Sequence, residues 1–282
     1  MAVLDAPQTF DSEEAARARR ARIHGIARWT LPVGVMACSL LAWHFYVTLW
    51  EVPHYVLPGP VLIAQTLVTD WAMLWDATIV TSRLTLLALI MAIIGGVSLA
   101  VAFTQSKWAE MSFFPYAVIL QVTPVIAIAP LLQVYMESAF AAALTCAWIV
   151  AFFPILSNTT IGLKSTDPNL DDLFTIYGAS RWQRLYLLAA PSALPFFLGG
   201  LKIAGGLALI GAVVAEFVIG RAGTGLGLAS TLLEASYRFN FGRLFACLFL
   251  ISALGVVIFG IMSTISHLAL RKWHESALAR ER

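Results

Sequence analysis

Residues 200–217 read GLKIAGGLALIGAVVAEF, an apolar run that is interrupted only by one lysine and one glutamate. Small residues recur at every fourth position of this run, at Gly200, Ala204, Ala208 and Ala212. Because residues four apart share one face of a helix, the run predicts a helix with a seam of small side chains. Inside a membrane, such a seam lets another helix approach closely.

The rest of the chain has a similar composition. Of its 282 residues, 60% are hydrophobic and only 12% are charged, and the mean hydropathy is +0.82. A soluble domain of this length needs far more charge to cover its surface. The net charge of +2 gives no reason to expect nucleic-acid binding. The three cysteines are scattered and read as small apolar residues, not as a disulfide framework or a metal site.

Transmembrane helices follow from the apolar runs, since a hydrocarbon core about 30 Å thick requires roughly twenty apolar residues per helix. We predict an all-α membrane protein with six transmembrane helices and a transmembrane domain over residues 29–270. Residues 1–28 form an N-terminal helix or tail and residues 271–282 a C-terminal tail. The six stretches are Trp29–Trp50, Thr78–Thr104, Phe113–Tyr135, Ala139–Asn158, Leu194–Ile219 and Leu244–Leu270.

The basic residues predict the orientation, because cytoplasmic loops carry an excess of Lys and Arg. With both termini in the cytoplasm, thirteen of the eighteen basic residues fall on that side. They are Arg17, Arg19, Arg20, Arg22, Arg28, Lys107, Lys164, Arg181, Arg184, Arg271, Lys272, Arg280 and Arg282. Residues 164–192 are then cytoplasmic. A leader helix over Asp11–Arg28 and an amphipathic helix over Val61–Trp75, along the outer interface, are also expected.

The segment 164–192 carries its own helix signals. Asp167 followed by Pro168 is a good helix start, and Gly178 suits the left-handed residue that ends a helix after Tyr177. Ser180-Arg-Trp-Gln183 reads as a capping box that opens a second short helix, which Pro191 and Pro195 would end. The exposed aromatics beside charged residues favour docking of another protein over an ordinary surface loop.

This segment resembles the conserved cytoplasmic loop of ABC importer permeases. The family pattern is Glu-Ala-Ala, three residues, Gly, nine residues, Ile, one residue and Leu-Pro. Here Asp172-Leu173-Phe174 leads to Gly178, then to Leu188 and to Ala190-Pro191, so the glycine and proline keep their spacing. Asp-Leu-Phe replaces Glu-Ala-Ala and Ala-Pro replaces Leu-Pro, so this pattern alone has moderate specificity.

Further stretches are similar to permeases of the nitrate, sulfonate, taurine and pyrimidine-precursor importers, over about residues 57–275. They are Leu57–Pro60, Pro124–Leu132, Gly178–Gln183, Gly200–Phe217 and Gly225–Ser230. The resemblance implies the type I ABC importer permease fold, in which this loop is the coupling helix that sits in a groove of a separate ATPase. The residues implied to dock there are Asp171, Asp172, Phe174, Tyr177, Gly178, Ala179, Ser180, Arg181 and Trp182. It further implies the bacterial inner membrane, two ATPase subunits, a second copy of the permease as a homodimer, and a periplasmic binding protein.

Candidates for the translocation pathway come from the third and fifth stretches. Pro115, Pro124 and Pro130 interrupt the third, and helix breaks in a membrane are tolerated where helices pack together or line a watery cavity. The seam in the fifth stretch is most simply a packing surface, and it would surround the pathway if the same helix of a second copy packs on it. The candidates are Gln121, Thr123, Gln133, Ala208, Ala212 and Glu216.

The chain contains no G-x-x-x-x-G-K-[ST] motif, so it is not expected to hydrolyse ATP itself or to bind a cofactor. ATP and Mg²⁺ are expected on the partner subunits. The function predicted is that of a permease for a small solute such as a sulfonate, nitrate, taurine or a pyrimidine precursor. An ion-coupled secondary transporter is the alternative, although no internal repeat is evident.

Overall fold

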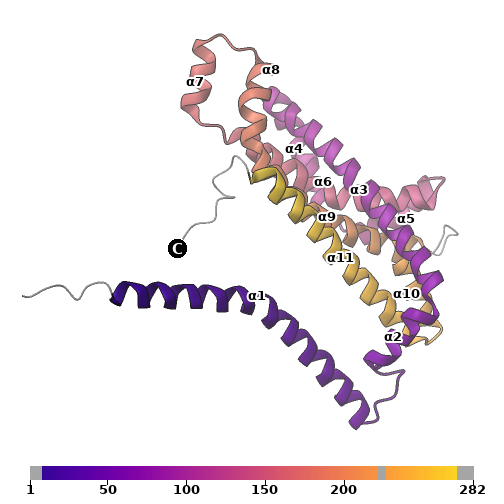
Figure 1. Cartoon of the computed structure of the whole chain (residues 1–282). Coiled ribbons are helices and arrows are strands. Elements are labelled where there is room, and N and C mark those ends of the chain that lie inside the picture. Colours follow the sequence, from indigo (N-terminus) through magenta and orange to yellow (C-terminus); the bar gives the residue numbers. More distant parts are fainter. Residues whose placement is uncertain (1–7, 221–226, 272–282) are drawn as a thin grey trace, which may run out of the picture. The chain divides into compact units, whose positions relative to one another are not determined.

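A computed structural model describes residues 8–220 and 227–271, with side chains from Thr30 onward, and every regular element in these ranges is a helix (Figure 1). The chain divides into two units, Met1–Gln65 and Thr66–Arg282. Of the predicted C-terminal tail 271–282, only Arg271 is among the described residues. Residues 221–226 also lie outside them, and these include the first two residues of the Gly225–Ser230 motif.

The first unit consists mainly of one long helix, α1 (Gln8–Leu49, 42 residues). The predicted leader and first span are therefore continuous, and the helix begins before Asp11. Pro32 lies inside α1, which is drawn as a bent helix in Figure 1. Its apolar part, Thr30–Leu49, is long enough to cross a membrane.

A short helix, α2 (Pro60–Thr69), links the two units. The predicted amphipathic helix Val61–Trp75 is thus shorter than expected, because the chain breaks at Asp70 and a new helix starts at Trp71. The second unit then contains α3 (Trp71–Gln105), α4 (Lys107–Val122), α5 (Val125–Tyr135), α6 (Ala139–Lys164), α7 (Pro168–Ile176), α8 (Arg181–Arg184), the π-helical turn η1 (Leu185–Ala189), α9 (Ala190–Ile219), α10 (Leu228–Tyr237) and α11 (Phe241–Leu270).

The predicted third span is a pair of helices, α4 and α5, which meet at an angle of 103°. Pro124 has no N–H to donate, and it holds the preceding Thr123 in an extended conformation (φ −73°, ψ 125°). Together, α4 and α5 still connect opposite ends of the unit. Lys107 lines the same pocket as Arg184 at one end, and Ala139, the first residue of α6, lines the same cavity as Glu216 at the other. Counting this pair as one span, the described chain has up to six helices able to cross a membrane.

The prediction that Pro191 ends the second short helix is wrong. Instead, α8, η1 and α9 run without a break from Arg181 to Ile219. In η1 the helix widens, so that the N–H of Ala190 donates to the carbonyl of Leu185, five residues earlier. The wider turn accommodates Pro191, which has no N–H to donate to a carbonyl of the preceding turn.

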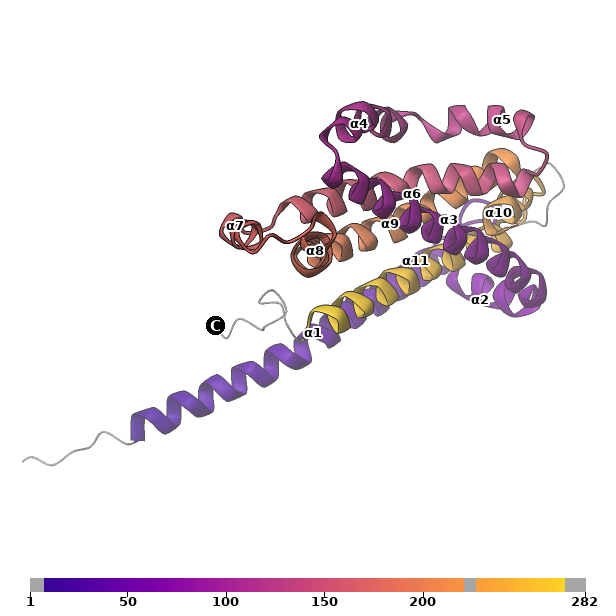
Figure 2. The ribbon, with the colours of Figure 1, turned by 90° about the horizontal axis from the view of Figure 1, so that it is seen from above.

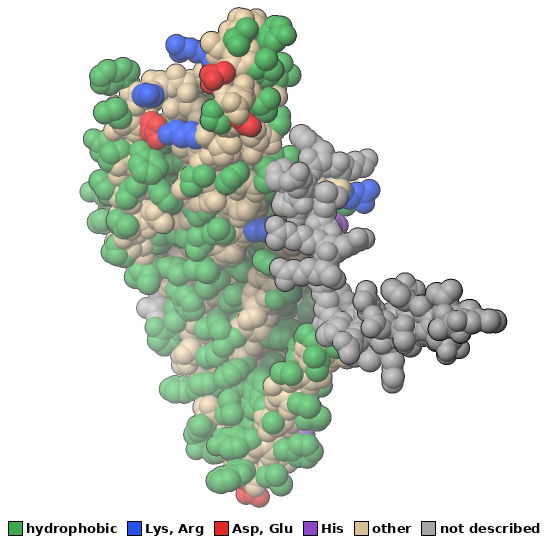
Figure 3. All heavy atoms as spheres, turned by 90° about the vertical axis from the view of Figure 1, so that its left-hand side faces the viewer, with side chains coloured by type: hydrophobic (Ala, Val, Ile, Leu, Met, Phe, Trp, Pro, Cys, Tyr) green, Lys and Arg blue, Asp and Glu red, His purple; other side chains and the backbone are tan. Residues whose placement is uncertain are grey.

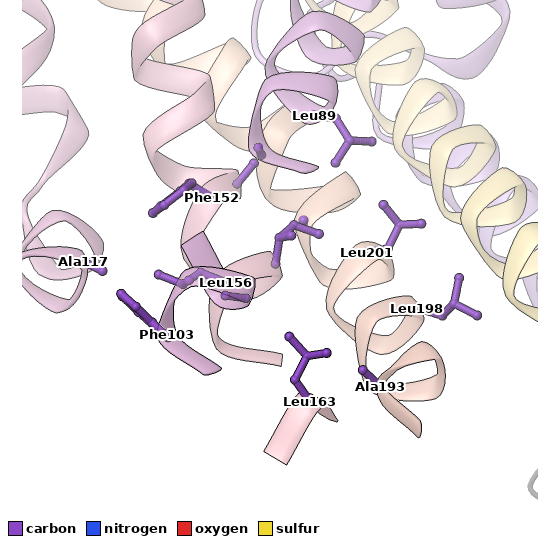
Figure 4. Packing of buried hydrophobic residues seen from close by; sticks show 14 of the residues in the cluster. Leu89, Phe103, Ala117, Phe152, Leu156, Leu163, Ala193, Leu198 and Leu201 are labelled. Carbon is purple, nitrogen blue, oxygen red and sulfur yellow. The ribbon is translucent and has the colours of Figure 1, made fainter. Parts of the chain in front are cut away.

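The core of the second unit forms where α6 packs between α3 and α9 (Figure 2). Figure 4 shows side chains from α3, α4, α6 and α9 converging, among them Phe103, Phe152, Leu156 and Leu201. On the other faces of these helices, α4 and α5 contact α6, and α11 contacts α9.

The seam of small residues packs against α6 of the same chain. A Cβ on Gly200 would lie 2.8 Å from the carbonyl oxygen of Pro154, and one on Gly211 would lie 2.9 Å from the Cα of Ala147. Ala208 and Ala212 have 0% of their surface exposed. These two side chains therefore do not face a pathway within the described chain, and they lie instead in clusters formed with residues of α3 and α6.

Glu216 joins three helices at the end of the unit opposite α7. Its side chain is 5% exposed. The hydroxyl of Thr81 on α3 donates to Oε1 (2.8 Å), and the N–H of Ala229 on α10 donates to Oε2 (3.0 Å). The same Thr81 oxygen accepts from the N–H of Leu228 (2.9 Å). A carboxylate and a hydroxyl from other helices thus cap the N-terminus of α10.

The close packing of α9 on α6 predicts opposite effects for two glycines of α9. Gly211→Ala should destabilise the protein by about 1–3 kcal/mol, because its Cβ would collide with the backbone of α6. Gly206→Ala is the matched control, since no atom lies within 4 Å of its added Cβ. It should leave the protein as stable or slightly more stable. Thermal unfolding of the purified variants measures both, and equal melting temperatures would contradict the packing described.

The Glu216 network predicts that Thr81→Val lowers stability by about 1–3 kcal/mol, because it leaves the buried N–H of Leu228 without its acceptor and Glu216 Oε1 without its donor. Thr81→Ser keeps the hydroxyl and should lose much less. The readout is again thermal unfolding in detergent. If Thr81→Val unfolds at the same temperature as the wild type, the hydrogen bonds of Thr81 do not stabilise the protein.

Candidate functional site

Helix α7 exposes apolar side chains that have no partner in the described chain. None of its residues is buried. Ile176 and Tyr177 are each 81% exposed, and Leu173 is 45% exposed. Figure 1 shows α7 at the end of the second unit, set apart from the ribbons of the core helices. On a surface that faces water, an exposed apolar patch of this kind usually marks a site of interaction.

Three local devices hold α7 and α8 in shape, and each was predicted from the sequence. The carboxylate of Asp167 accepts from the N–H of Asn169 (2.8 Å) and caps α7. After α7, Gly178 is left-handed (φ +69°). The N–H of Gly178 donates to the carbonyl of Thr175 (3.0 Å), and the N–H of Ala179 to that of Phe174 (2.9 Å). This pair of bonds is a Schellman motif.

The capping box at the start of α8 is also confirmed. The side chain of Ser180 accepts from the N–H of Gln183, and the side chain of Gln183 accepts from the N–H of Ser180. These two bonds satisfy donors at the start of the helix that no helical carbonyl can reach. The turn between α7 and α8 is therefore set by local hydrogen bonds, and its geometry does not depend on packing.

The predicted docking residues divide into two groups. Six are exposed: Asp172, Tyr177, Gly178, Ser180, Arg181 and Trp182. Three are partly buried: Asp171, Phe174 and Ala179. Asp171 turns toward α8, where its carboxylate lies 3.6 Å from the guanidinium of Arg184. Leu173 and Ile176 were missed, although their spacing on one side of a short helix was a readable signal.

We call the exposed side chains of this end the α7–α8 surface; it comprises Asp172, Leu173, Ile176, Tyr177, Arg181 and Trp182. The ring of Trp182 stacks on that of Tyr186, with centroids 6.1 Å apart. Figure 3 shows Lys, Arg, Asp and Glu side chains gathered at this end, above a body covered with hydrophobic side chains. Aromatic and arginine side chains around an apolar patch are typical of a protein-docking surface.

The predicted pathway residues do not form one cluster. Gln121 is exposed and Thr123 is partly exposed, and both lie at the break between α4 and α5. Gln133 on α5 is partly buried. Glu216 lies elsewhere, with both carboxylate oxygens already engaged. Beside it is a small cavity of about 160 Å³. Arg83, also on the wall of this cavity, lies over the ring of Phe140 at 5.9 Å.

The chain is similar to membrane subunits of known transport systems. Residues 92–269 match the family of binding-protein-dependent transport system inner membrane components. A probable ABC transporter permease protein of Haemophilus influenzae is 30% identical over 84% of this chain and 95% of its own length. The riboflavin transport system permease protein RibX of Chloroflexus aurantiacus is 34% identical over 87% and 90%. The formylaminopyrimidine transport permease protein ThiX of Halalkalibacterium halodurans is 31% identical over 79% and 91%.

A solved structure supports the same fold. A chain from the crystal structure of an amino acid ABC transporter with histidines aligns with a TM-score of 0.59, over 74% of this chain and 97% of that one. At 20% identity this likeness speaks for the fold alone. The predicted type I permease fold is confirmed, and the chain belongs to the binding-protein-dependent transport system inner membrane components, the multi-pass permease subunits of ABC importers.

Proposed function

We propose that this permease works as a homodimer in the bacterial inner membrane, with two ATPase subunits and a periplasmic binding protein. Docking of an ATPase is supported by the α7–α8 surface, whose apolar and aromatic side chains are exposed among the described residues. In this proposal α7 sits in a groove of the ATPase, and Tyr177, Arg181 and Trp182 make the central contacts. ATP and Mg²⁺ bind to the ATPase, and the permease itself is not catalytic.

The distribution of charge supports cytoplasmic termini. Lys107, Lys164, Arg181 and Arg184 gather at the α7–α8 end. At the opposite end, the described residues of this unit include three basic side chains, Arg83, Arg238 and Arg243. An excess of basic side chains is typical of the cytoplasmic side. We propose that both termini lie on this side, since six crossings would bring them to the same face of the membrane and the basic side chains favour this face as the cytoplasmic one.

A second copy of the chain would cover the exposed face of α4 and α5. Val122, Ile126, Val134 and Tyr135 are between 63% and 83% exposed. Some of this apolar surface can face lipid, but Pro124 has no N–H for a carbonyl of α4, and a carbonyl without a donor is costly in lipid. Pairing two copies along this face would enclose the break, and would place Gln121, Thr123 and Gln133 on a shared pathway.

The continuous helix Arg181–Ile219 supports a direct route for the coupling. A movement imposed on α8 by the ATPase passes through η1 into α9 without an intervening loop. Because α9 packs on α6 at backbone distance, the two helices move together. We infer that closure of the ATPases turns the pathway outward by this route, and that their reopening releases solute inside.

For the solute, we propose a heterocyclic compound of the vitamin-precursor class. Two relatives that align over about nine-tenths of their length are named for riboflavin and formylaminopyrimidine. The test is to reconstitute the permease with its ATPase and binding protein, and to screen heterocycles, sulfonates, taurine and nitrate for stimulation of ATP hydrolysis. Stimulation by a sulfonate, taurine or nitrate alone would refute the solute class. Uptake driven by an ion gradient without the ATPase would refute the importer and favour a secondary transporter.

The turn after α7 gives a direct test of coupling. Gly178→Val should reduce solute-stimulated ATP hydrolysis and uptake about tenfold, because a β-branched residue is strained by roughly 1–2 kcal/mol in the left-handed region. Gly178→Asn is the matched control, since asparagine tolerates this conformation. No atom lies within 4 Å of an added Cβ, so a steric clash cannot explain the difference. Normal uptake by the valine variant would contradict the coupling role.

A further inference from the structure

A polar pocket lies where α8 meets the ends of the core helices. Its volume is about 370 Å³. The walls come from the end of α3, the start of α4, the link after α6, and from α7, η1 and α8. Its polar side chains are Thr104, Gln105, Lys107, Thr166, Asp171, Arg181 and Arg184. None of these seven belongs to the α4–α5 break, and only Asp171 and Arg181 belong to the predicted docking set.

The pocket carries a surplus of positive charge. Lys107, Arg181 and Arg184 face a single carboxylate, that of Asp171. The distance of 3.6 Å between the Asp171 carboxylate and the nearest guanidinium nitrogen of Arg184 is too long for a hydrogen bond. The nearby Lys164 and Glu110 neutralise one another and do not line the pocket. Two of the three positive charges therefore lack a balancing acid on the pocket wall.

Arg184 also has an unused donor. Its Nε atom is buried and has no hydrogen-bond partner among the described residues. A buried donor without an acceptor destabilises the folded state unless a ligand or solvent provides one. Since Arg184 lines the pocket, an acceptor bound there could satisfy the guanidinium.

We propose that this pocket binds a phosphate group. Guanidinium groups bind phosphate oxygens with paired hydrogen bonds, and lysine and threonine add a charge and a hydroxyl donor. The core helices that form the walls end here, α3 at Gln105 and α6 at Lys164, so the pocket lies at the level of lipid headgroups. The group belongs either to an anionic phospholipid or to a soluble phosphate ester. The lipid source rests on the cytoplasmic orientation proposed above, because anionic lipids are enriched on that side.

A bound phosphate would join elements that ATPase docking is expected to move. Arg181 and Arg184 belong to α8, which continues into α9, whereas Lys107 starts α4 and leads to the break at Pro124. Occupancy would therefore hold α8 against the α3–α4 junction. We expect it to change the rate of coupled ATP hydrolysis, and to leave docking of the ATPase intact.

The test uses the full-length permease in detergent and native mass spectrometry. Phosphatidylglycerol, phosphatidylcholine, inorganic phosphate and glycerol phosphate are titrated separately. The wild type should retain phosphatidylglycerol or a soluble phosphate at least several-fold better than Lys107→Gln and Arg184→Gln do. Arg238→Gln is the matched control, because it removes one positive charge at the opposite end and should bind like the wild type.

The outcomes separate the possibilities. Preference for phosphatidylglycerol assigns the site to lipid, and retention of glycerol phosphate or inorganic phosphate assigns it to a soluble anion; both support a phosphate site. Equal retention by all variants, or equal retention of phosphatidylcholine, overturns it. Loss of ATPase copurification in Lys107→Gln without any loss of phosphate binding would mean that an acidic side chain of the ATPase fills the pocket, which also overturns it. Binding is measured without the ATPase, so its result does not depend on whether the chain is an importer.

Discussion

The close approach of α9 to α6 is the constraint on which the second unit depends. Lipid tails are as apolar as leucine, so two membrane helices gain little from burying large side chains against each other. They gain instead from dense contact, which small residues allow. Gly200 and Gly211 bring the backbone of α9 within reach of Pro154 and Ala147 on α6. With α6 and α9 locked together, α3 and α11 can pack on the resulting pair.

The surfaces that remain uncovered follow from this packing. The α6–α9 pair, together with α3, covers one face of α4 and α5 and leaves their other face exposed, as it does the surface of α7. Those two regions expose apolar side chains, one at the end of the unit and one along its flank. In the proposed importer the ATPase covers the surface at the end, and a second copy of the chain covers the flank. The continuous helix from α8 to α9 then links the first interface to the core.

Glu216 illustrates how a charged residue in an apolar run can be structural. In the sequence it stood at the end of a seam, and its place near the outer mouth suggested a role in transport. In the structure its two oxygens are taken up by Thr81 and by the N-terminus of α10. A carboxylate without hydrogen-bond donors is costly inside a membrane. One that caps another helix instead accepts hydrogen bonds from backbone N–H groups that have no other acceptor. Thr81 is 135 residues from Glu216 in the sequence, and Ala229 is 13 residues from it.

The sequence alone determined the features that rest on short-range physics. Apolar runs determined the membrane helices, and capping residues determined α7, its Gly178 end and the start of α8, because these signals act over a few residues. Only the tertiary structure decided that the chain breaks at Pro124 and not at Pro115 or Pro130, and that it continues through Pro191. It likewise decided that Ala208 and Ala212 are buried in the core and that Glu216 caps α10. These outcomes depend on which helix lies opposite a given residue, and no local spacing contains that information.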